Sequence, residues 1–175
     1  IKEKKYQHYQ NQEQCLYRFY QEKDFFQLCE TLHTIFFEEN FPCLEDKIQS
    51  LVCQKPTAIE VLEAITKIFP NQKGIPQNTK SACKRLCLFL RWMIRKNSEV
   101  DFGIWNILQE KDLIIPLDTH VFRISKQLSL TNRKQADMLT AIQITEKLKI
   151  TFPDDPLLGD YALFGYGVKH QEKTK

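Results

Sequence analysis

The carboxylate of Asp118 is the first candidate for chemistry in this sequence, because an apolar run leads directly to it. Residues 113–117 read Leu-Ile-Ile-Pro-Leu, and a helical pattern follows Asp118. An aspartate at a helix start caps backbone N–H groups, which is worth about 1 kcal/mol. The apolar approach also predicts partial desolvation, and a carboxylate held in this way can stabilise a developing cation or transfer a proton. Both roles stay open on local grounds, and the four scattered histidines predict no Ser-His-Asp arrangement.

A stretch of positive charge is the second candidate. Between Glu63 and Glu99 there is no acidic residue, and the stretch carries eight basic ones: Lys67, Lys73, Lys80, Lys84, Arg85, Arg91, Arg95 and Lys96. Four of them fall within about 60° of one helix face at the usual 100° per residue: Lys80, Lys84, Arg91 and Arg95. No glutamate lies four residues away from Lys80, Lys84 or Arg91 to pair with them, which favours a polyanion partner, nucleic acid first, over a merely solvated face.

Helical periodicity dominates the elements that must position these residues. Apolar residues recur at helical spacing over seven segments: 24–39, 57–69, 78–96, 101–109, 118–128, 137–152 and 155–168. Alternation of strand length is hard to find, so the sequence predicts an all-α fold, a compact multi-helix bundle formed as one domain over residues 1–175. The predicted core face of segment 78–96 carries four apolar side chains: Leu86, Phe89, Leu90 and Met93.

Composition supports one ordinary globular domain. The chain has 175 residues, 42% of them hydrophobic, with 12 phenylalanines and a net charge of only +3, which argues against disorder. No apolar run is long enough to span a membrane, and the N-terminal residues carry neither a signal peptide nor an initiator Met, as in a piece cut from a longer protein. We therefore expect no membrane association.

The six cysteines predict neither a metal site nor a disulfide framework. They form no Cys-x-x-Cys pair and no Cys/His cluster at zinc spacing. Cys29, Cys83 and Cys87 continue apolar helix faces, so we expect buried free thiols in a reducing, cytoplasmic compartment.

Three segments carry a resemblance to a known superfamily. Residues 116–123, Pro-Leu-Asp-Thr-His-Val-Phe-Arg, resemble the V-D-T-H-V-x-R segment of helix-hairpin-helix DNA glycosylases, the endonuclease III and adenine glycosylase superfamily. Residues 160–168 resemble the A-L-M-D-L-G-A segment of the adenine glycosylases. Residues 83–93 and 100–105 are most similar to an uncharacterised bacterial family, a divergent branch of that superfamily. The resemblance is strong over residues 78–168, whereas residues 1–70 share only helical character.

This resemblance implies a site and a partner. Asp118 matches the catalytic carboxylate of the superfamily, and Lys84 matches the lysine that attacks the sugar C1′ in its bifunctional members, with Lys80 one helical turn away as the other alignment. Duplex DNA is the implied partner, with its phosphates bound by basic residues: Lys73, Lys80, Arg85, Arg91 and Arg95. No cofactor is implied, and no cysteine follows Cys87 to hold the iron–sulfur cluster of the endonuclease III branch.

The sequence also departs from the superfamily pattern. The hairpin motif L-P-G-V-G is replaced by residues 73–79, which contain a single glycine, and the early helix with base-displacing residues has no visible counterpart. Three functions therefore remain: a glycosylase or AP lyase that removes a damaged base, a DNA-binding relative without catalysis, and a helical module that binds an acidic protein. The observation that would best distinguish these three functions is whether Lys84 and Asp118 lie together in one cleft.

Overall fold

The computed structural model of the chain describes residues 1–96 and 98–169, and its architecture is helical apart from one small hairpin. The α-helices of this part are α1 (Glu22–His33), α2 (Leu44–Gln49), α3 (Ala58–Ile68), α4 (Lys84–Ile94), α5 (Thr119–Gln127), α6 (Met138–Lys149) and α7 (Leu158–Lys169). Shorter elements are η1 (Lys5–Tyr9), the π-helical η2 (Thr34–Glu38), η3 (Glu110–Asp112) and the antiparallel strands β1 (Cys15–Tyr17) and β2 (Tyr20–Gln21). The predicted all-α class is confirmed.

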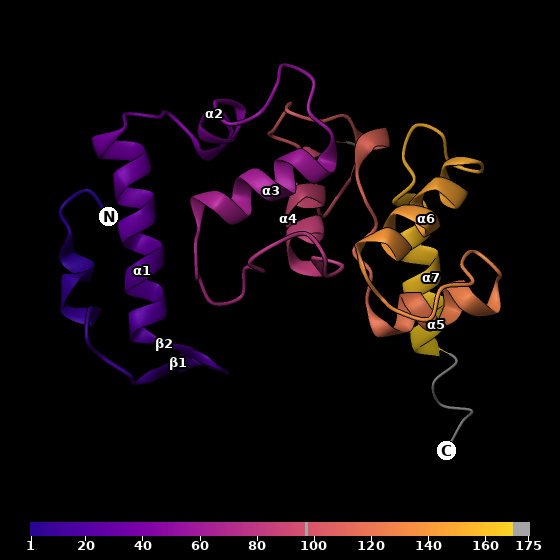
Figure 1. Cartoon of the computed structure of the whole chain (residues 1–175), viewed down its shortest axis with the longest axis horizontal. Helices are drawn as coiled ribbons and strands as arrows, with labels where there is room; N and C mark the ends of the chain where they lie inside the picture. Colours follow the sequence, from indigo (N-terminus) through magenta and orange to yellow (C-terminus); the bar gives the residue numbers. More distant parts are fainter. Residues whose placement is uncertain (97, 170–175) are drawn as a thin grey trace.

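The elements follow one another along the long axis of the molecule. Figure 1 shows α1 and the β1–β2 hairpin at one end, α3 and α4 in the middle, and α5, α6 and α7 together at the other end. The middle of the molecule therefore joins two ends that are far apart in sequence, and α4 can contact both.

No helix in the described residues is long and apolar enough to cross a membrane.

Polar caps start three of the predicted helices where the sequence placed them. Thr57 and Glu60 form a reciprocal capping box at the start of α3, in which the Thr57 amide donates to Glu60 Oε2 at 2.7 Å. Asp118 caps α5 and Asp137 caps α6, each by accepting a backbone N–H bond three residues along the chain. Such caps satisfy amides that otherwise lack a partner in the first turn of a helix.

Two predicted helices differ from the structure. Helix α4 begins at Lys84 instead of residue 78, because residues 80–82 run alongside the start of α6: Ser81 forms a β-bridge with Asp137, and the Met138 amide donates to the Lys80 carbonyl. Segment 101–109 is not helical. Its backbone instead folds back on α4, where the Phe102 amide donates to the Trp92 carbonyl at 2.7 Å.

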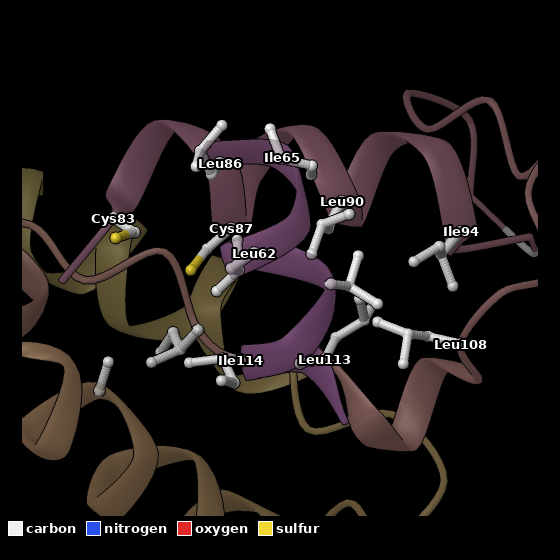
Figure 2. Packing of buried hydrophobic residues seen from close by; sticks show 14 of the residues in the cluster. Leu62, Ile65, Cys83, Leu86, Cys87, Leu90, Ile94, Leu108, Leu113 and Ile114 are labelled. Atoms are coloured by element: carbon white, nitrogen blue, oxygen red, sulfur yellow. The ribbon is translucent and has the colours of Figure 1, made fainter. Parts of the chain in front are cut away.

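The core of the molecule forms where α3 and α4 pack on the extended segment that leads toward α5. Figure 2 shows the labelled side chains of this cluster converging from the three segments: Leu62, Ile65, Cys83, Leu86, Cys87, Leu90, Ile94, Leu108, Leu113 and Ile114. Leu86 and Leu90 are buried as predicted, whereas Phe89 and Met93 are only partly buried.

The cysteines follow the prediction in part. Cys29, Cys83 and Cys87 are buried and free, as their positions on apolar faces predicted. Cys15 and Cys53 are exposed, also as free thiols.

Candidate functional site

Lys84 and Asp118, which are 34 residues apart in sequence, meet in the structure. Lys84 Nζ donates a hydrogen bond to Asp118 Oδ2 at 3.1 Å. The Asp118 side chain is 11% exposed, whereas that of Lys84 is 49% exposed, so the ammonium group remains accessible from solvent. The structure thus brings together the two residues that the resemblance places in one site.

Each partner of this pair is positioned by the start of a helix. Lys84 is the first residue of α4, and the preceding Cys83 has a left-handed backbone with φ of 45°, which turns the chain sharply into the helix. Asp118 is the N-cap of α5, and its Oδ1 accepts from the Val121 amide at 2.8 Å. One carboxylate oxygen therefore holds the helix while the other faces Lys84.

The surroundings of Asp118 keep its carboxylate ionised. Burial acts to raise the pKa of Asp118, but the Val121 amide and the Lys84 ammonium outweigh it and hold the pKa below its ordinary value. An anion with a rigid backbone anchor and little water around it is suited to stabilise positive charge that develops beside it.

A cavity of about 300 Å³ opens beside the pair. It is bounded by α4, by the start of α5 and by α7, through the residues Lys84, Leu88, Arg91, Pro116, Asp118, Val121, Asp160, Tyr161 and Phe164. Tyr161 and Phe164 are 41% and 48% exposed, so aromatic surface at its edge is open to a ligand. The cavity thus combines an amine, two carboxylates and aromatic rings.

Asp160 is a second carboxylate in this cavity, and sequence reasoning did not select it. Its Oδ2 accepts from Arg91 Nη1 at 3.0 Å, and the residue is 7% exposed. Burial raises the pKa of Asp160 to about 6, because it outweighs the attraction of Arg91, and the nearby Asp118 charge acts in the same direction as burial. The only signal in the sequence was its place at the start of segment 160–168.

The structure corrects the prediction that Arg91 and Arg95 bind DNA phosphates. Both are buried, with 8% and 6% exposure. Arg91 pairs with Asp101 and Asp160, and Arg95 pairs with Asp101 at 3.1 Å and Asp155 at 2.7 Å. Tertiary folding supplies Asp155 and Asp160 from distant segments, and Asp101 comes from the segment after α4 that folds back on the helix.

The remaining predicted cations lie around the start of α4. Lys84 and Arg85 line an open groove of about 770 Å³ together with Arg18, which follows strand β1. Lys80 is exposed just before the helix. Lys73 lies 3.4 Å from Asp24 in an ion pair and stands 5.9 Å from the ring centroid of Phe19. The cationic surface is therefore the groove at the start of α4, not a stripe along it.

Arg18 is a cation that sequence reasoning missed. It stands among aromatic residues in the run Tyr17-Arg18-Phe19-Tyr20, and such interleaving of basic and aromatic residues is a signal of nucleic-acid binding. Arg85 lies 5.4 Å from the ring centroid of Phe19, which ties the hairpin to α4. Neither Arg18 nor Arg85 forms an ion pair with any described residue.

Among the described residues, no group of three or more His, Cys, Asp or Glu side chains is arranged to hold a metal ion.

In the comparison with known proteins, the model of the family described as "Protein of unknown function (DUF2400)" matches residues 1–169. No curated protein and no solved structure matches the chain.

Proposed function

The chain belongs to the DUF2400 family, and we propose that it is a DNA-binding enzyme with the fold of the helix-hairpin-helix DNA glycosylases, which removes a base by cleaving its N-glycosidic bond. The observation that carries the proposal is the 3.1 Å contact between Lys84 and Asp118 at the edge of a cavity. The superfamily resemblance selected these two residues from the sequence. The fold that this resemblance implies would also place them together.

In the proposed reaction, Lys84 is the nucleophile. The Lys84 ammonium group first loses a proton to solvent. The neutral amine then attacks the sugar C1′, the C1′–N bond to the base breaks, and the bonding electron pair leaves with the base, which takes up a proton from solvent. The proton released from Lys84 passes to Asp118, with which it already shares a hydrogen bond. Before that transfer, the Asp118 carboxylate stabilises the positive charge that builds on the sugar as the bond to the base lengthens.

The groove at the start of α4 is the proposed contact with the phosphate backbone. Arg18 and Arg85 offer charges without a protein counterion among the described residues, and Lys80 is exposed next in sequence to Ser81, which lines the groove. The α4 N-terminus has no side-chain cap, and uncapped helix amides favour an anion. Contacts of this kind bind DNA without sequence preference and weaken with salt.

Borohydride trapping on a duplex with one abasic site tests the proposal. A Schiff base between Lys84 and the sugar is reduced to a stable covalent adduct, which migrates as one band with protein and DNA. We expect the adduct with the native chain and with Lys111→Gln, an exposed control, and its loss with Lys84→Gln.

The other outcomes separate the alternatives. An adduct that survives Lys84→Gln and is lost with Lys80→Gln would move the nucleophile by one turn. DNA binding with no adduct would leave a binding protein without lyase chemistry. Absence of DNA binding at low salt would overturn the proposal and favour a module that binds acidic proteins.

A further inference from the structure

A second cavity, of about 540 Å³, plays no part in the proposed reaction. It lies where α1 and the β1–β2 hairpin face α3 and α4 (Figure 1), and it shares no lining residue with the cavity beside Lys84. Its volume falls within the range of small-molecule sites, roughly 300–1,000 Å³. The cavity is therefore large enough for a ligand of its own.

Apolar and aromatic side chains make up most of its lining. Leu28 comes from α1, Ile65 from α3 and Phe89 from α4, and the hairpin contributes Leu16 and Tyr17. Leu16 and Tyr17 are 49% and 62% exposed, so the cavity opens to solvent on the side of the hairpin. Apolar surface that stays in contact with water favours a ligand whose own apolar surface covers it. The lining therefore suits a hydrophobic ligand body.

Two basic residues of the lining, Lys73 and Arg85, place their charges at this opening. The Lys73 ammonium and the Arg85 guanidinium lie 5.9 Å and 5.4 Å from the ring centroid of Phe19. The Phe19 ring is 4.6 Å from the ring of Tyr20, which also lines the cavity, and Phe19 is 44% exposed. Both charges are therefore held beside one exposed ring of the hairpin.

One of these two charges is compensated within the protein. Lys73 forms an ion pair at 3.4 Å with Asp24, the third charged residue of the lining, whose Oδ2 also accepts from the Gln21 amide at 2.8 Å. Arg85 forms no ion pair within the described part of the chain. The charged groups of the lining thus leave one positive charge without a counterion.

We propose that this cavity binds a hydrophobic monocarboxylate, with its apolar body against the leucines and aromatic rings and its carboxylate on Arg85. A guanidinium can hold a carboxylate through two parallel hydrogen bonds. A cationic head group in the same place would be repelled by Arg85 and Lys73. The proposal does not depend on the reaction at Lys84 and would stand if abasic DNA is not trapped.

Isothermal titration calorimetry with three small probes tests the proposal. Decanoate has an apolar chain and a carboxylate, decylammonium has the same chain with a positive charge, and butyrate has the carboxylate with a short chain. Below the concentrations at which micelles form, we expect one decanoate per chain, bound about tenfold more tightly than decylammonium, and no saturable binding of butyrate. Equal affinities for decanoate and either of the other two probes, or no decanoate binding, would overturn the proposal.

Two variants locate the two parts of the ligand. Arg85→Gln should remove the difference between decanoate and decylammonium, whereas Lys134→Gln, exposed and outside the cavity, should keep it. Leu16→Asp places a carboxylate in the apolar lining and should weaken decanoate binding at least tenfold, whereas Leu139→Asp, 62% exposed on α6, should not.

Both variants keep the test valid, because Leu16 is half exposed and Arg85 is exposed, so neither replacement removes core packing. An unchanged preference for decanoate in Arg85→Gln would overturn the placement of the carboxylate. Unchanged decanoate binding in Leu16→Asp would place the ligand elsewhere and overturn the proposal.

Discussion

The two ends of α4 carry the same kinds of residue and use them in opposite ways. At its start, Lys84 and Arg85 are exposed beside an open groove, and Arg85 has no counterion among the described residues. Toward its end, Arg91 and Arg95 are buried among three aspartates. The comparison teaches that a cation on a helix face is a ligand contact or a structural residue according to the acids that the fold brings to it.

The largest effect should come from the buried end. Replacing Arg95 with Gln leaves Asp155 without its cation and Asp101 with only Arg91, and breaking a buried ion pair by removing one partner costs about 3–5 kcal/mol of unfolding free energy. The matched change at the exposed end, Arg85→Gln, should stay within about 0.5 kcal/mol. Urea unfolding measures both, and equal losses would remove the distinction between the two ends.

At the buried end, where Asp160 pairs with Arg91, the unfolding free energy should also change with pH in an unusual direction. Because the pKa of Asp160 is raised from 3.8 to about 6, the folded state binds more protons than the unfolded state between these values. This group therefore favours the folded state below about pH 4, and its contribution is lost as the pH rises through 6. The difference in unfolding free energy between native protein and Asp160→Asn should shift across that window by on the order of 3 kcal/mol. A difference that does not vary with pH would contradict it.

At the exposed end the expected effect is on DNA binding. Replacing Arg18 and Arg85 together with Gln should remove two phosphate contacts and flatten the slope of log affinity against log salt by about two. The measurement is duplex binding by fluorescence anisotropy at several salt concentrations. If the slope stays the same, the phosphates lie on another surface. Lys134→Gln, exposed and distant in sequence, serves as the single-charge control.

The smallest expected effect on stability distinguishes a residue that only caps a helix from one that also takes part in the proposed reaction. Asp118 and Asp137 are both N-caps, so replacing either with Ala should cost about 1 kcal/mol in unfolding free energy. Only Asp118→Ala should also reduce borohydride trapping, because Asp137 lies outside the cavity beside Lys84. If both variants trap abasic DNA equally well, Asp118 is a cap and nothing more.

Local signals were enough to predict several elements and one site residue. Thr57 and Asp118 predicted the starts of two helices, because a capping side chain accepts a hydrogen bond from an amide only three residues further along the chain. The periodicity of Leu86 and Leu90 likewise predicted the buried face of α4. Segment 101–109 has similar composition but folds back on the carbonyls of α4, and no local pattern distinguishes these two outcomes.

Lys84 and Asp118 could be selected from sequence by their motifs, but their 3.1 Å contact depends on where α4 and α5 begin in space. The burial of Arg91 and Arg95 and the presence of Asp160 in the cavity were decided by tertiary structure alone. The physical reason is the range of the interactions. Capping bonds and helix periodicity relate residues that are at most about four positions apart. Arg95 and Asp155 are 60 residues apart, and they meet only because α4 packs against α7 and the residues just before it.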